Sequence, residues 1–316
     1  MLHRLALTAL VALAAAPVAA VTVPSSIIVF GDSLVDAGNI DAAVGSDLYN
    51  PKAKGYYPGR FTNGFDYTDL LNERLYGHAL TPSLLGGTDY AFGGARIVND
   101  GDAVPDLAAQ VGFYFAKTSN TADANALYVI NAGGNDVFGI ESGSIGSFGS
   151  TALYTTALLD TLAGSIQALS AAGARHILVT GIPNVDATGF GIEAQVQARL
   201  DTVQAGLGST QLLRFSYINF FTAVSTTPAA FGLPPFTHAG NCITGSPAVG
   251  GIIDCTGYFS FDGTHPTAAI QGALYNQIVS LTGLDTVPEP ATWALMIVGF
   301  GMVGTAARRR NRVAVA

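Results

Sequence analysis

Three residues of this sequence have the types and spacing that nucleophilic catalysis by serine requires. A serine hydroxyl is a weak nucleophile until a base takes its proton, and that base works best when a carboxylate fixes its tautomer. Ser33 offers the hydroxyl, while Asp262 and His265, three residues apart, offer the carboxylate and the base from one predicted turn. Together they predict acyl transfer through a covalent intermediate on Ser33.

Two further segments could stabilise the negative charge that develops on the carbonyl oxygen. Backbone N–H groups on glycine loops and a side-chain amide suit this role because they are in place before the reaction begins. Gly94 lies in the segment 90–95, Tyr-Ala-Phe-Gly-Gly-Ala, and Asn135 lies in the segment 133–136, Gly-Gly-Asn-Asp. We therefore expect an oxyanion hole made by Ser33, Gly94 and Asn135.

Each of these segments alone also has an ordinary structural interpretation. The sequence Gly-Asp-Ser-Leu can be a simple turn, Asp262 and His265 can cap a helix, and Gly-Gly-Asn-Asp is common where a strand ends. The order of all four from the first strand to the last helix is far more specific than any one of them. The chain contains no Gly-x-Ser-x-Gly segment, so the nucleophile elbow of α/β-hydrolases is absent.

Other polar residues near these segments are expected to have structural roles. Asp36 and Asn39 are predicted to brace the loop after Ser33, and Asp136 is predicted to cap the turn that follows it. His176 is expected to lie at a strand end or in the core, and His78 and His238 are expected to lie in loops, exposed to solvent.

The segments that must position the site alternate between strand and helix patterns. Apolar, β-branched runs followed by glycine predict strands over 26–30, 127–131 and 176–180, and apolar residues at helical spacing predict a helix over 155–172. A weaker strand over 214–219 and a closing helix over 266–281 complete the pattern. This alternation predicts an α/β fold, a three-layer α/β/α sandwich with a mostly parallel sheet, and long loops over 40–90 and 221–260.

Such a sheet would gather the chemistry at one edge. Ser33 and Asn135 both follow predicted strands, and ligands bind at the carboxyl ends of the strands in open α/β sheets. The sequence therefore predicts one site at that edge.

With these residues in order, the chain resembles the SGNH or GDSL-type serine hydrolase family over nearly all of residues 26–282. The resemblance implies a flavodoxin-like fold and a hydrolase of carboxylic esters that needs no metal or cofactor. It also implies that Ser33, Gly94, Asn135 and His265 match the four residues that name the family, with Asp262 as the third member of the triad.

A second likeness points to one branch of that family. The segment 59–64, Gly-Arg-Phe-Thr-Asn-Gly, resembles a segment of the plant-lipase-like branch. Asp89 departs from that branch, which usually has asparagine before the tyrosine at position 90. This difference leaves the packing around the Gly94 loop open, and it leaves the assignment of Ser33 unaffected.

Two other functions remain open at this point. One is a catalytically inactive binding protein of the cell envelope or exopolysaccharide that keeps the same fold, although a binding protein would need none of the catalytic residues. The other is a metal-dependent hydrolase, for which the candidate ligands would be Asp32, Asp136, Asp262 and His265.

Charge and composition exclude some partners. The net charge is −8 over the whole chain, and residues 21–287 alone carry nine Lys and Arg against 21 Asp and Glu, a net charge of −12. Such a surface repels phosphate backbones, so we expect an ester substrate and no nucleic-acid partner.

The two ends of the chain predict sorting signals. Residues 1–20 have a short head with Arg4, an apolar run and small residues at their end, the layout of a signal peptide. Residues 287–316 contain Pro-Glu-Pro, an apolar run over 291–307 and an arginine cluster, and they resemble the PEP-CTERM sorting signal. That resemblance implies one transmembrane helix, a transient inner-membrane anchor in a Gram-negative bacterium and processing by an exosortase. A hydrolase domain over 21–286 would lie between the two signals.

Two patterns in the chain suggest further structure. Cys242 and Cys255 are the only cysteines, and in an exported chain we expect them to form a disulfide, although two free thiols remain the alternative. The sequence over 299–304 matches Gly-x-Gly-x-x-Gly, but no acidic residue follows it, so we do not interpret it as a dinucleotide site.

Overall fold

A central parallel sheet of four strands organises the computed structural model, which describes residues 23–284. The strands are β1 (Ile27–Gly31), β2 (Leu127–Asn131), β3 (His176–Val179) and β4 (Gln211–Arg214), and they lie side by side in chain order. The register pairs Gly31 with Asn131, and Val179 with both Ile130 and Arg214. Strands β1 and β2 are buried along their whole length, as expected for parallel strands covered on both faces.

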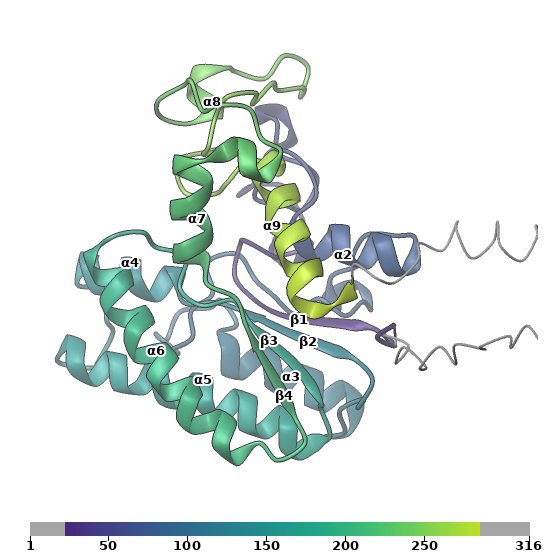
Figure 1. Ribbon diagram of the computed structural model, residues 1–316, viewed down its shortest axis with the longest axis vertical. Coiled ribbons are helices and arrows are strands. Elements are labelled where there is room, and N and C mark those ends of the chain that lie inside the picture. Colours follow the sequence, from purple (N-terminus) through teal and green to yellow (C-terminus); the bar gives the residue numbers. More distant parts are fainter. Residues whose placement is uncertain (1–22, 285–316) are drawn as a thin grey trace, which may run out of the picture.

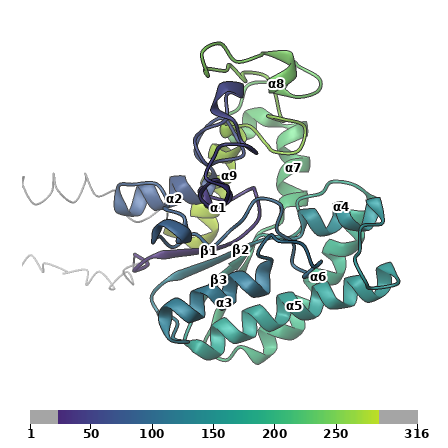
Figure 2. The same ribbon diagram turned by 180° about the vertical axis from the view of Figure 1, so that it is seen from behind.

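Helices cover both faces of this sheet (Figures 1 and 2). Alternate side chains of a strand point to opposite faces. The longer helices are α2 (Tyr67–Tyr76), α3 (Leu107–Thr118), α4 (Gly134–Ser142), α5 (Thr151–Ala172), α6 (Ala187–Gly206), α7 (Tyr217–Thr226) and α9 (Ala268–Thr282). On β1, Ile28 and Phe30 pack with helices α3, α5 and α6, whereas Ile27 and Val29 pack with α2, α7 and α9. The fold is thus the three-layer α/β/α sandwich predicted from the sequence.

Short helices lie in the connections above the sheet. They are α1 (Asn39–Val44), α8 (Cys242–Gly245) and the 3-10 turns η1 (Lys52–Lys54), η2 (Ser83–Leu85) and η3 (Pro228–Phe231). None of the helices within residues 23–284 is long and apolar enough to cross a membrane. The predicted signal peptide and the predicted C-terminal apolar span lie outside the described residues.

The fourth strand was predicted in the wrong place. The sequence pattern indicated 214–219, but β4 ends at Arg214, and helix α7 begins at Tyr217. Ser216 caps this helix because its hydroxyl accepts from the N–H of Asn219. The buried apolar residues of α7 recur at helical spacing, with Phe221 and Val224 on the face of Tyr217. The pattern over 214–219 contains residues that favour strands. The Ser216 cap and the helical spacing of the buried residues determine the structure instead.

The prediction of a long loop over 40–90 also needs correction, because this stretch contains helix α2. Asp66 caps the helix by accepting from the N–H groups of Thr68 and Asp69, and Gly77 ends it in a left-handed conformation. The guanidinium of Arg60 holds Asp69 through two hydrogen bonds of 2.6 and 2.8 Å. The segment 59–64 is thereby fixed to α2.

Buried carboxylates hold the loop that follows β1. Asp36 accepts from the N–H groups of Gly38, Asn39 and Gly93, and the amide of Asn39 donates to the carbonyls of Asp89 and Ala91. Asp36 and Asn39 thus brace this loop, as the sequence predicted.

Asp89, the residue that departs from the plant-lipase-like pattern, takes part in the same bracing. It is fully buried, and its two carboxylate oxygens accept from the N–H groups of Ala37 and Ala91. An asparagine here would offer one acceptor oxygen in place of two, so the aspartate suits the two N–H groups that converge on it.

The buried carboxyl of Asp66 should make the free energy of unfolding depend on pH. Burial raises the pKa of Asp66 to about 7, the charge of Asp69 adds to this, and Oδ2 of Asp66 has no hydrogen-bond partner among the described residues. A carboxyl whose pKa is raised in the folded state stabilises the fold fully below the unfolded pKa, near 4, and this contribution is lost as the pH rises through about 7.

Asp66→Asn should therefore reduce the fall in melting temperature between pH 4.5 and pH 8, because the amide keeps the cap and cannot ionise. The measurement is thermal unfolding of both proteins across that range. Asp186→Asn is a matched control, since Asp186 caps α6 from a partly exposed position. An equal slope in wild type and Asp66→Asn would contradict the interpretation.

Candidate active site

The carboxyl ends of β1 and β2 meet where the predicted site residues lie. Ser33 follows β1 by two residues, and Asn135 lies in the first turn of α4, which begins three residues after β2. The two strands approach closely because Gly31 has no side chain: a Cβ there would lie 2.1 Å from the carbonyl oxygen of Asn131. This close approach brings residues about 100 positions apart in the sequence to one edge of the sheet.

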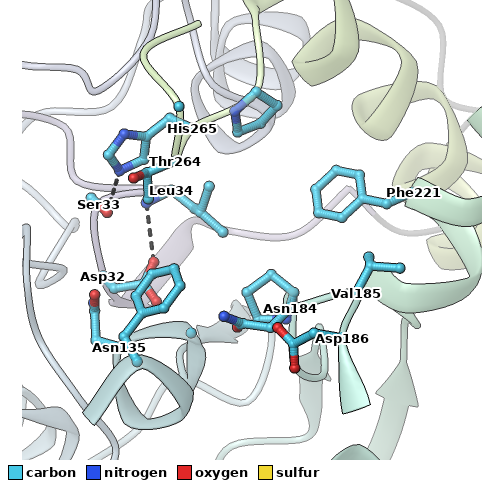
Figure 3. A pocket seen from close by; sticks show the side chains of 15 residues that line it. Asp32, Ser33, Leu34, Asn135, Asn184, Val185, Asp186, Phe221, Thr264 and His265 are labelled. Carbon is cyan, nitrogen blue, oxygen red and sulfur yellow. Dashed lines mark hydrogen bonds between the residues drawn. The ribbon is translucent and has the colours of Figure 1, made fainter. Parts of the chain in front are cut away.

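Ser33, His265 and Asp262 form a continuous chain of hydrogen bonds. His265 Nε2 lies 2.7 Å from Ser33 Oγ (Figure 3). On the other side of the ring, His265 Nδ1 lies 2.7 Å from Asp262 Oδ2. The other oxygen of Asp262 accepts from the backbone N–H groups of Thr264 and His265 at 2.9 and 2.8 Å. Because Asp262 and His265 are three residues apart, one turn of the chain carries both side chains. The hydrogen bonds from the backbone to Asp262 close this turn.

The electrostatics of Asp262 favour its ionised form. Burial acts to raise the pKa of Asp262, but the hydrogen bonds from the side chain and backbone of His265 and from Thr264 outweigh it and lower the pKa to about 2. An ionised carboxylate beside Nδ1 accepts a hydrogen bond from the N–H that this nitrogen carries in one tautomer of the neutral imidazole. The lone pair of Nε2 then faces the hydroxyl of Ser33, as a general base requires.

Tyr56 contacts the same carboxylate, which the sequence did not predict. Its hydroxyl donates to Asp262 Oδ2 at 2.9 Å, and its ring packs edge-on against Phe261 at 4.7 Å. The two residues are 206 positions apart, and no local pattern in the sequence marks the contact.

The segment 59–64 supports the loop that carries His265. The Thr62 hydroxyl donates to the carbonyl of Pro266 at 2.8 Å, and Asn63 Oδ1 accepts from the N–H of Ala268 at the start of α9, also at 2.8 Å. The ring of Phe61 lies 5.2 Å from the imidazole of His265. These contacts fix both the loop and the imidazole plane.

A disulfide restrains the loop that precedes Asp262. Cys242 and Cys255 are bonded to each other and pack with Tyr258 and Phe261, directly before Asp262. The two cysteines are 13 positions apart in the sequence. A disulfide that closes a loop of this size stabilises the folded state by about 3 kcal/mol.

The three expected oxyanion donors differ in how they are placed. Among the described residues, the backbone N–H groups of Ser33 and Gly94 donate to no acceptor. The amide of Asn135 donates one hydrogen to the carbonyl of Ala95 at 2.8 Å, which leaves its second hydrogen free. Ser33 and Asn135 line the pocket at this edge, whereas Gly94 is exposed and is not part of the pocket wall.

Asp136 does not cap the turn that follows it, contrary to the sequence prediction. Its carboxylate is fully buried and accepts from the N–H groups of Ile97 and Val98 and from the hydroxyl of Tyr154. Asn135 and Asp136 therefore both hold the segment after Gly94, one through a donor and the other through acceptors. With Asp136 turned to this loop and Asp262 to His265, the four proposed metal ligands do not converge on one point.

Asp32 forms part of a buried polar network beneath Ser33. Its Oδ1 accepts from the N–H of Leu34 at 3.0 Å and lies 3.4 Å from the amide nitrogen of Asn131. The oxygen of that amide accepts from the hydroxyls of Tyr67 and Tyr217. Burial raises the pKa of Asp32 to about 7, although the N–H of Leu34 and the charge of His265 lower it. The network fixes the turn that presents the serine hydroxyl.

A pocket of about 240 Å³ opens beside Ser33 and His265 (Figure 3). The loop between β3 and α6 forms its far wall, which the sequence interpretation did not anticipate, although this loop also follows a strand at the carboxyl edge. The wall is partly apolar and partly polar. The apolar side chains that line the whole pocket are Leu34, Phe138, Pro183, Val185, Phe221 and Pro266, and the polar ones include Asn135, Asn184 and Asp186.

Two known proteins are similar to parts of this chain in sequence. Lipase 1 of Photorhabdus luminescens is 33% identical over 167 residues, which cover 52% of this chain and 23% of that protein. A GDSL esterase/lipase of Arabidopsis thaliana is 30% identical over 207 residues, which cover 51% of this chain and 52% of that protein. The chain thus spans about half or less of the length of these relatives.

A solved structure also aligns with most of this chain. The acetylxylan esterase Axe2 of Geobacillus stearothermophilus is 15% identical with a TM-score of 0.45, covering 82% of this chain and 94% of that one.

Family models match two parts of the chain. The PEP-CTERM protein-sorting motif matches residues 286–310, as expected from the Pro-Glu-Pro sequence and the basic tail. The model of the GDSL-like Lipase/Acylhydrolase family matches residues 27–278, which include every residue of the hydrogen-bonded chain described above. This chain therefore belongs to the GDSL-like lipase/acylhydrolase family.

Proposed function

We propose that this protein is an exported serine hydrolase that cleaves carboxylic esters through an acyl-enzyme on Ser33. The observation that carries the proposal is the chain of two 2.7 Å hydrogen bonds from Ser33 through His265 to Asp262, which ends at a pocket open to substrate. An inactive binding protein would gain nothing from an aligned nucleophile, base and ionised carboxylate, so this arrangement favours the hydrolase.

The proposed reaction has two half-reactions. Ser33 Oγ attacks the carbonyl carbon while its proton moves to His265 Nε2, and the ionised Asp262 stabilises the imidazolium that forms. The N–H groups of Ser33 and Gly94 and the free amide hydrogen of Asn135 receive the oxyanion. His265 then protonates the leaving alcohol, and a water molecule, activated by the same base, releases the acid from Ser33.

We also propose the route by which the enzyme reaches its site of action. A signal peptide over residues 1–20 would start export, and the PEP-CTERM motif supports processing of the C-terminal segment by an exosortase. The apolar run over 291–307 would anchor the chain transiently in the inner membrane, with the arginine cluster on the cytoplasmic side. Release would place the hydrolase at the cell surface or outside the cell.

The first prediction concerns the nucleophile. Ser33→Ala should abolish turnover of activated esters and covalent labelling by a fluorophosphonate, because both depend on the same hydroxyl. Its melting temperature should stay near that of wild type, since Ser33 is at the surface of the pocket and not in the core. Labelling that persists in the variant would show that another residue reacts.

The second prediction concerns Tyr56 as a positioning residue. Tyr56→Phe removes one donor to Asp262 and keeps the ring packing, so kcat should fall by about tenfold or less while KM stays nearly constant. Tyr57→Phe is the matched control, because the structure gives Tyr57 no contact with the triad, and it should behave as wild type. Equal kinetics for the two variants would refute a role for the Tyr56 hydroxyl.

The third prediction concerns Asn135. Asn135→Ala should lower kcat by about a hundredfold to a thousandfold with little change in KM, because an oxyanion donor acts in the transition state. The carbonyl of Ala95 loses its partner in this variant, so the melting temperature should also be measured. A kcat within threefold of wild type, with or without a lower melting temperature, would rule out the oxyanion role.

A further inference from the structure

The side chain of Asn184 is a polar group for which the fold offers no partner. It lies in the loop between β3 and α6, is 8% exposed and faces the pocket across from Ser33 and His265 (Figure 3). Its Oδ1 is fully buried and has no hydrogen-bond partner among the described residues, and none of the hydrogen bonds found in residues 23–284 involves its amide nitrogen.

The surrounding loop is built to keep Asn184 in this position. Glu193 accepts from the N–H of Ile182 before it, and Asp186 caps α6 after it by accepting from the N–H of Gly189. Gly189 also makes room for the loop, since a Cβ there would lie 2.1 Å from the carbonyl oxygen of Asn184. Both ends of this short loop are thus anchored, and the side chain between them has little freedom to turn away.

Asn184 also lies against the first turn of α4, next to the expected oxyanion donor Asn135. A Cβ on Gly134 would lie 3.4 Å from Asn184 Oδ1. Asn184 thus lines the pocket beside the helix turn that carries Asn135. This location suits contact with a substrate bound in the pocket.

An unpaired buried amide costs stability, so its presence needs a reason. Leaving a buried polar atom without a partner destabilises the folded state, whereas an apolar side chain of similar shape would avoid that cost. Either orientation of the amide leaves one buried atom unpaired, an acceptor in one case and a donor in the other. A hydroxyl is the simple neutral group that satisfies both, because it can donate and accept.

The other walls of the pocket agree with a neutral, hydroxylated ligand. Asp186 adds a carboxylate beside Asn184, which disfavours an anionic substrate and offers a further acceptor for a hydroxyl. Phe138 and Val185 are 46% and 48% exposed, and together with Phe221 they offer apolar surface for carbon atoms. A plain acyl chain would use this apolar surface and leave Asn184 unpaired.

We propose that Asn184 is a specificity-determining residue that binds a hydroxyl group of the ester substrate, so that esters with such a hydroxyl react faster than their deoxy analogues. This inference rests on the proposed ester hydrolysis by Ser33. A site built to bind a hydroxyl discriminates strongly against analogues that lack it, because its polar group is then left unpaired.

Two matched pairs of substrates test the proposal and distinguish the acyl side from the alcohol side. The acyl pair is p-nitrophenyl lactate and p-nitrophenyl propionate, and the alcohol pair is glycerol monobutyrate and propyl butyrate. In wild type, kcat/KM should favour the hydroxylated member of at least one pair by about tenfold or more. In Asn184→Leu and Asn184→Ala that ratio should fall to within about threefold of one.

Two controls separate specificity from folding and from catalysis. Asn125→Leu makes the same substitution in the exposed loop before β2 and should keep the wild-type ratio. Asn184→Leu should have a melting temperature equal to or above that of wild type, whereas an asparagine needed for structure would lower it.

The outcomes separate this inference from the proposed function. Wild type that is labelled by a fluorophosphonate and hydrolyses plain esters, but shows no preference in either pair, would overturn the role of Asn184 alone. A preference that survives in both Asn184 variants would overturn it as well. Absence of both labelling and turnover in wild type would overturn the proposed function together with this inference.

Discussion

The ionised carboxylate of Asp262 is the group on which the geometry of the site depends. Four donors converge on its two oxygens: two backbone N–H groups, the imidazole of His265 and the hydroxyl of Tyr56. The hydrogen bonds from His265 and Thr264, together with the charge of His265, lower the pKa of Asp262 to about 2 despite its burial. The negative charge in turn fixes the tautomer of His265 and directs Nε2 to Ser33. Neutralising this one group would remove the charge that fixes the tautomer of His265 and, with it, the direction of the base.

The remaining loops of the site are held by other buried carboxylates in a similar way. Asp36 and Asp89 hold the loop after β1 and the strand-like segment before Gly94, and Asp136 holds the segment after it. The oxygens of each carboxylate accept hydrogen bonds from backbone N–H groups that would otherwise need a partner in a sheet or helix. Burial raises the pKa of all three, so the organised loops carry a cost in stability at neutral pH.

The parts of this arrangement that are local in sequence could be predicted, and the parts that depend on distant contacts could not. The strands at 127–131 and near 26–30 and 176–180, and the pairing of Asp262 with His265, follow from patterns within a few residues. The contacts of Tyr56 with Asp262 and of Asp136 with the 97–98 segment join residues far apart, and nothing in the sequence around them indicates the partner. Asn184 was overlooked for a related reason: its significance comes from a missing partner, which only the packed structure reveals.

The central claim is that an ester passes its acyl group to Ser33 before water receives it. The most direct measurement is to mix the protein rapidly with an activated ester, quench with acid during the first turnover and map the acyl group by peptide mass spectrometry. The account predicts one acyl group per chain on the peptide that contains Ser33, and none on that peptide in Ser33→Ala. Turnover without any acylated peptide, or acylation of a different residue in the active protein, would contradict it.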